Sequence, residues 1–137
     1  MVKTAGYSGT PLLSKLGVKE GSRLALMKAP VGFSKWLPAL PGGATVNQRG
    51  ADEADVILLF VMWQTDLKSL AAAMKRMRPG GGMLWVAWPK KASKIVTDLS
   101  ENIVRDAGLA LGLVDTKVCA IDDTWSGLRF SRRKTKA

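Results

Sequence analysis

The sequence contains no histidine, and this absence excludes several kinds of active site at once. Catalytic devices of the Ser-His-Asp and Cys-His type need an imidazole, and so do metal sites built on histidine, so no metal site is predicted. The chain also has a single cysteine, which cannot form an internal disulfide. Cys119 stands in the alternating run Thr116–Ala120. Free cysteine is usually a small buried hydrophobe, so we expect a packed side chain there and not a reactive thiol.

Long apolar segments are missing as well. The longest apolar run, Val56–Trp63, is far shorter than the roughly 20 residues that span a bilayer. The first residues contain no apolar stretch of the kind found in signal peptides. Together with the single cysteine, which suits a reducing compartment, these features predict a cytoplasmic protein.

Acidic residues are scarce beside the basic ones, and the formal net charge is +10. Five of the 21 basic residues follow Leu128, whereas none of the 11 acidic residues does. The length predicts one domain over residues 1–137, and the charge distribution predicts that it ends in a short basic tail. Such a tail is either a solvated end of the chain or a segment that attracts polyanions.

The segment from Ala54 to Pro89 has the order strand, amphipathic helix, Pro-Gly turn, strand, which is typical of a β-α-β crossover. Apolar and alternating runs predict six strands, over Arg23–Met27, Thr45–Asn47, Val56–Met62, Met83–Trp88, Val114–Ile121 and Leu128–Arg132. The last two are separated by six residues, which can join only antiparallel strands. We therefore predict a three-layer α/β sandwich with a mostly parallel sheet that ends in an antiparallel hairpin.

Three helices are expected before and between these strands, besides one or two helical turns over Phe33–Leu40. The first begins at Thr10-Pro11 and ends before Gly17, the second is capped by Thr65, and the third is capped by Thr97 or Asp98 with Glu101 completing a capping box. The buried face of the second helix is expected to consist of Leu67, Leu70, Ala71, Met74 and Met77, with Lys68, Lys75 and Arg76 on the outer face. The glycines of Arg78–Gly82 precede a strand and do not open a helix, so this segment is predicted to be a turn and not a phosphate-binding loop.

Three long stretches, LGVKEGSRLAL, MKRMRPGGGMLWVAW and LGLVDTKVCAIDDTWSGLRFSRR, resemble the Rossmann-like methyltransferase class over nearly the whole chain. The chain is more closely similar to a family of small bacterial proteins described only as a domain of unknown function, through YSGTPL, WPKKAS, TDL and DDTWSGL. The resemblance implies a Rossmann-like sheet closed by a hairpin. The name of the small bacterial family implies no particular activity.

The resemblance also implies a glycine-rich loop after the first strand that binds S-adenosylmethionine, and here that loop is degenerate. It reads Leu26–Phe33, in which Gly32 is the only glycine, Pro30 has no N–H, and Val31 adds a branched side chain where contact is expected. The acidic residue expected after the second strand is replaced by Asn47-Gln48-Arg49. We therefore predict no cofactor and lean toward a protein that is not an enzyme.

Ligands of open α/β sheets bind outside the carboxyl ends of the strands. Four loops should meet there, and they supply the candidate ligand residues Lys28, Trp63, Trp88, Lys90, Lys91, Ser93, Asp122, Asp123 and Trp125. Lysines would hold a phosphate or carboxylate, Ser93 would donate a hydrogen bond, and an indole would stack on a flat group. A structural alternative is that Asp122 and Asp123 pair with Lys90 and Lys91 to hold two loops together, with Trp125 as an anchor.

Three functions follow from these patterns. The first is a non-catalytic methyltransferase-like module that binds a small anionic ligand or a protein partner. The second is a nucleic-acid-binding protein that uses its basic surface and tail. The third is a divergent methyltransferase. The sequence leaves the oligomeric state open.

Overall fold

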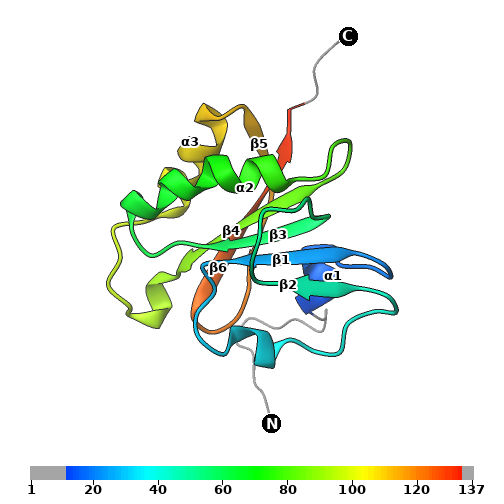
Figure 1. Ribbon diagram of the computed structural model, residues 1–137. Coiled ribbons are helices and arrows are strands. Elements are labelled where there is room, and N and C mark those ends of the chain that lie inside the picture. Colours follow the sequence, from blue (N-terminus) through cyan, green and yellow to red (C-terminus); the bar gives the residue numbers. More distant parts are fainter. Residues whose placement is uncertain (1–11, 134–137) are drawn as a thin grey trace.

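Six strands form one mixed sheet in the computed structural model, which describes residues 12–133 (Figure 1). In chain order the strands are β1 (Arg23–Met27), β2 (Thr45–Asn47), β3 (Val56–Phe60), β4 (Met83–Pro89), β5 (Leu113–Ala120) and β6 (Trp125–Arg132). Their order across the sheet is β2-β1-β3-β4-β6-β5. The first four are parallel, and β6 is antiparallel to both β4 and β5. The predicted fold class is confirmed.

Both faces of the sheet are covered, which explains why β3 and most of β4 are apolar throughout. On one face, α2 (Leu70–Arg76) and α3 (Glu101–Ala110) pack on alternate strand residues such as Ile57, Leu59 and Val86. The other face is covered by α1 (Leu12–Leu16) and the 3₁₀ helix Phe33–Trp36. There the fully buried Trp85 donates an indole hydrogen bond of 3.0 Å to the carbonyl of Leu16. The expected cap at Thr10-Pro11 lies outside the described residues.

The entry to the second helix differs from the prediction. A 3₁₀ helix, Gln64–Ser69, precedes α2, and the carboxylate of Asp66, not Thr65, accepts the N–H groups at its start. The buried face includes Ala73 in place of the exposed Ala71. Arg76, expected on the outer face, is buried, and its Nε donates to the carbonyl of Asp52 at 2.9 Å. A long-range backbone acceptor therefore draws this arginine inward.

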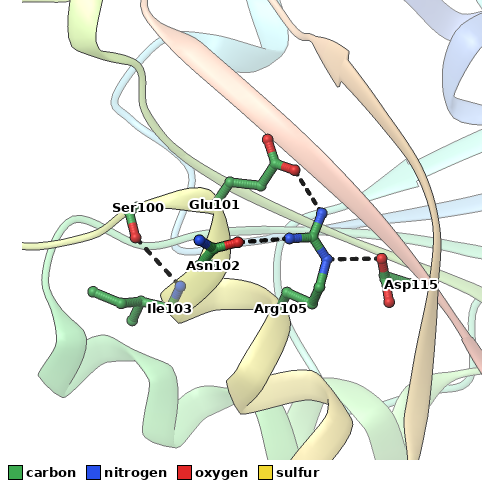
Figure 2. A network of polar contacts seen from close by, with 6 residues as sticks. All are labelled: Ser100, Glu101, Asn102, Ile103, Arg105 and Asp115. Atoms are coloured by element: carbon green, nitrogen blue, oxygen red, sulfur yellow. Dashed lines mark hydrogen bonds and ion pairs between the residues drawn. The ribbon is translucent and has the colours of Figure 1, made fainter.

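The predicted cap of the third helix is also wrong, because Thr97 and Asp98 bond to another loop. Thr97 Oγ1 donates to the carbonyl of Met62, and the Asp98 carboxylate accepts the N–H of Gln64 at 2.8 Å. The N-cap of α3 is Ser100, whose hydroxyl accepts the N–H of Ile103 (Figure 2). These bonds tie the loop before α3 to the loop after β3.

Arg105 fastens α3 to the edge strand β5. Its guanidinium donates to Glu101 and Asn102 on its own helix, and its Nε donates to the carboxylate of Asp115 on β5 at 2.8 Å (Figure 2). Because one planar group satisfies three acceptors, the helix is held at a fixed distance from the strand. Among residues 12–133, no helix has the length and apolarity needed to cross a membrane.

Gly108 allows α3 to lie against β6, which gives a first prediction. A methyl group at this position would overlap the ring of the fully buried Phe130. Gly108→Ala should therefore lower the free energy of unfolding by about 1–3 kcal/mol, although alanine is the better helix former. Urea denaturation of Gly108→Ala, Phe130→Leu and the double variant measures this. The double variant should lose less than the sum of the single losses, and a stabilised Gly108→Ala would contradict the packing.

Candidate functional site

The strand order creates a crevice between the carboxyl ends of β1 and β3. From β1 the chain moves outward to β2 on one side, and then returns to place β3 on the other side of β1 (Figure 1). The loops that leave β1 and β3 consequently diverge in opposite directions. In open α/β sheets such a reversal of strand order is the usual place for a ligand.

The loop after β1 is closed by a tight turn. The N–H of Phe33 bonds the carbonyl of Pro30 at 3.0 Å, and Gly32 has φ 83° and ψ −2°, the values of the third residue of a type II turn. Val31 occupies the second position, and its side chain is fully exposed. The expectation that Val31 stands where a cofactor makes contact stays a prediction. Lys28, at the start of the loop, has a left-handed backbone with φ 57°.

A cavity of about 350 Å³ opens at this crevice. Its lining consists of Lys28, Pro30, Phe60, Met62, Asp66 and Trp125. Phe60 forms edge-to-face contacts with Phe33 on one side and Trp125 on the other, with ring centroids 4.8 and 5.0 Å apart. Trp125 itself is 7% exposed, so it forms a fixed wall. The cavity thus has a buried aromatic wall and two charged side chains in its lining.

The two charged groups of the cavity have different environments. The N–H of Met62 holds the pKa of the Asp66 carboxyl below its usual range, and the N–H of Trp63 and the charges of Lys28 and Lys68 act in the same direction. Asp66 is therefore ionised and already engaged with the backbone. The ammonium group of Lys28 forms no hydrogen bond or ion pair in the part of the chain that the structure describes. Lys28 is consequently the charged group of this cavity that is available to a ligand.

The structure brings only two of the nine predicted site residues, Lys28 and Trp125, to this cavity. Trp88 is 6% exposed and packs in the core beneath α2 and α3. Trp63 is 41% exposed on the surface of the adjoining loop. Sequence reasoning missed Phe60, Met62 and Asp66. The available signal was their place at the end of an apolar strand and at the start of the helix that follows it.

The remaining candidates lie on the neighbouring loops of the same edge. The hydroxyl of Ser93 donates to the carbonyl of Lys90 at 2.7 Å and accepts the N–H of Ile95, so it stabilises its own turn. The carboxylate of Asp122 accepts the N–H groups of Thr124 and Trp125. Asp123 follows Asp122 in the same turn and is exposed, and the next residue, Thr124, is half-buried. The role of these residues in ligand binding stays a prediction.

The two loops are joined through the backbone. The N–H of Lys90 donates to the carbonyl of Thr124 at 2.8 Å, which follows from the pairing of Pro89 with Trp125 at the end of the β4–β6 ladder. Neither Lys90 nor Lys91 forms an ion pair with another residue between 12 and 133. The loops are therefore clamped together as proposed, but by a main-chain hydrogen bond and not by the lysines.

The residues present do not fit S-adenosylmethionine in the manner that the methyltransferase resemblance implies. The turn after β1 contains one glycine, and Pro30 lines the cavity without an N–H to offer. At the end of β2 the side-chain oxygen of Asn47 accepts the N–H of Arg49 at 2.7 Å, so it caps a local turn. Asp52 and Glu53 lie beside a different hollow, together with Arg23 and Arg76. Within residues 12–133 no three acidic, histidine or cysteine side chains gather as a metal site would require.

Several solved structures have a similar fold. A SAM-dependent methyltransferase from Aquifex aeolicus matches with a TM-score of 0.50 and 15% identity over 87% of this chain and 86% of its own. Fibrillarin from Aeropyrum pernix, solved with natively bound S-adenosyl-L-methionine, matches with a TM-score of 0.53 and 13% identity over 92% and 70%. An uncharacterized protein from Listeria monocytogenes matches with a TM-score of 0.52 and 10% identity over 93% and 70%.

At these identities the similarity establishes the fold alone. The methyltransferase-like Rossmann fold is thereby confirmed. No family model and no curated protein matches the sequence. The resemblance to the small bacterial family therefore stays a prediction.

Asp66 supports a prediction on stability and pH. Asp66→Ala removes the acceptor of two N–H groups and should lower the free energy of unfolding by about 1 kcal/mol at neutral pH. The pKa of Asp66 is lowered in the folded protein from its ordinary value of 3.8. The carboxylate therefore contributes fully to the free energy of unfolding above pH 3.8, and this contribution disappears as the pH falls through the lower folded-state pKa. Denaturation midpoints between neutral pH and pH about 2 measure the difference between the two proteins.

The matched control is Asp106→Ala, which removes a carboxylate from the exposed face of α3. This control should leave stability within about 0.5 kcal/mol of the parent at every pH. A difference between parent and Asp66→Ala that persists unchanged at low pH would show that the carboxylate is not the stabilising group.

Proposed function

We propose that this protein is a methyltransferase-like module that binds a small ligand, with a planar ring and an anionic group, in the crevice between β1 and β3, and that it does not transfer methyl groups. The observation that carries the proposal is the cavity of about 350 Å³ at the point where the strand order reverses. Its volume lies within the range of small-molecule sites, and its lining combines apolar walls with few polar groups.

Lys28 supplies the anion contact in this proposal. Asp66 is the other charge of the cavity, and its carboxylate accepts two backbone N–H groups. The ammonium group of Lys28 is left for the ligand, and a lysine acts as a point charge toward phosphate or carboxylate. Its left-handed backbone is uncommon for a residue with a side chain, and strained positions of this kind concentrate at functional sites.

Phe60 and Trp125 supply the ring contact. Both belong to the buried cluster beside α1, and they hold each other edge to face, so neither has to be ordered when a ligand enters. A wall that is already rigid lowers the entropy cost of binding. A flat ligand can therefore gain apolar contact there while its anionic group remains near Lys28.

The proposed absence of methyl transfer rests on the two loops that hold the cofactor in the resembling class. Pro30 and the type II turn replace a run of glycines, and Asn47 replaces an acidic side chain. Backbone that is free of side chains and rich in N–H groups is what brings a nucleotide close to such a loop. Here one turn N–H is already bonded and the proline has none.

Calorimetric titration tests this function with three probes: adenosine 5′-monophosphate, uridine 5′-monophosphate and benzoate. We expect saturable binding of at least one probe and a loss of about tenfold in affinity in Lys28→Gln, equivalent to about 1.4 kcal/mol. Lys35→Gln removes the same charge from the nearby 3₁₀ helix outside the cavity and should change affinity by less than about twofold.

S-adenosylmethionine is titrated in parallel. Saturable heat with this compound, accompanied by methyl transfer to any acceptor, would overturn the non-catalytic part of the proposal. No saturable binding of any of the three probes, or equal losses in Lys28→Gln and Lys35→Gln, would overturn the ligand site itself.

A further inference from the structure

A second hollow lies at the opposite edge of the sheet. The turn Pro79–Gly82 enters β4 there, and β6 ends beside it, because Leu84 pairs with Phe130 in the β4–β6 ladder (Figure 1). Residues about 50 positions apart are thus brought together. The carboxyl end of β6 lies at this edge because β6 is antiparallel to β4.

This hollow has a volume of about 370 Å³, comparable to that of the crevice between β1 and β3. Its lining consists of Gly80, Gly81, Gly82, Met83, Ser131, Arg132 and Arg133. Within residues 12–133, no acidic residue belongs to the lining. A cavity with two guanidinium groups, a hydroxyl and side-chain-free backbone has the donor set that phosphate oxygens require.

Arg132 is fixed at the wall of the hollow. Its Nη2 donates to the carbonyls of Met74 and Met77 at 2.8 and 3.3 Å, so it satisfies the end of α2. Its Nε and Nη1 have no partner within residues 12–133. Nη2 is therefore anchored, and the N–H groups of Nε and Nη1 are available to a ligand.

Arg133 and Ser131 provide donors that the protein itself does not use. Neither side chain has a hydrogen bond or ion pair with another residue of the described chain. The nearby acid, Asp55, does not neutralise them, because its carboxylate is bound by Arg78 and by the N–H of Arg23. The positive charge at this edge is consequently not compensated.

Gly81 and Gly82 are required by the packing of the turn, and they also leave part of the hollow without side chains. A Cβ at Gly81 would lie 2.8 Å from the Arg78 guanidinium, and a Cβ at Gly82 would overlap the backbone of Arg78. Glycine at both positions lets Arg78 fold back over the turn toward Asp55. The part of the lining that comes from the turn, Gly80–Gly82, has no side chains, which permits close approach by an anion.

We propose that this hollow binds the phosphate group of a phosphorylated ligand, held by Arg133, the remaining N–H groups of Arg132 and the hydroxyl of Ser131. The phosphate belongs either to a free oligophosphate or to a nucleic-acid backbone, and the two sources present the same oxygen atoms to the guanidinium groups. The site is independent of the crevice at β1 and β3, which lies at the other edge of the sheet.

The experiment follows backbone amide resonances of the full chain during titration with tripolyphosphate and, separately, with a short oligo-dT strand. The changes in amide chemical shift should be largest at residues 80–83 and 131–133, and they should saturate as the probe concentration rises. Arg133→Gln and Ser131→Ala should each weaken binding, the former by about tenfold. Lys75→Gln, which removes an equal charge from the exposed face of α2, should change affinity by less than about twofold.

The two probes identify the source of the phosphate. Tighter binding of oligo-dT with a salt slope steeper than about −3 supports a nucleic acid, and equal or tighter binding of tripolyphosphate supports a free oligophosphate. Chemical-shift changes that do not saturate, or that spread over all lysines, would overturn the proposal. Equal losses of affinity in Arg133→Gln and Lys75→Gln would do so as well. Arg132 is left unchanged because its variants would also release the end of α2.

Discussion

The antiparallel pairing of β6 with β4 positions both candidate sites, because one eight-residue strand runs from one edge of the sheet to the other. Its first residue, Trp125, pairs with Pro89 and reaches across to Phe60, where it becomes a wall of the crevice. Its last residues follow the pairing of Phe130 with Leu84 and stand beside the glycine turn. The pairing register therefore determines which side chains meet at each edge. A shift by one residue would turn Trp125 out of the buried cluster and Arg133 away from the turn.

The strands could be predicted from the sequence because their signals are local. β1 and β2 have the predicted bounds, since each is a short run of strand-forming residues between turn residues. The helix caps could not be predicted in the same way. Thr97 and Asp98 have the residue types of a cap, but they bond to Met62 and Gln64, more than 30 positions earlier in the chain. A side chain that can cap a helix can also bond a distant loop, and only the folded arrangement decides between these partners.

The strand order predicts at which ends of the strands the crevice lies, but it does not predict which side chains line the crevice. Trp88 was expected at the rim, yet alternation along β4 places it opposite Trp85, in the core beneath α2 and α3. Trp125 was weighed as an anchor and as a ligand residue, and it is both a buried anchor and a wall. The hollow at the other edge could not be predicted, because the segment Arg78–Gly82 taken alone has only the pattern of a turn. Its arginines come from β6, and no local pattern reveals that pairing.

The crevice between β1 and β3 persists although the glycine-rich loop does not, and the reason lies in what creates each. The crevice results from the reversal of strand order, which depends on the buried apolar runs of the strands. The loop depends on three or four residues that contribute little to the core. Substitutions such as Pro30 can therefore remove close backbone approach to a nucleotide and leave the fold and its cavity intact. In the function that we propose, ligand binding and cofactor chemistry are therefore separate properties of this fold, and Lys28, in the lining of the cavity, is the charged group that contacts the ligand.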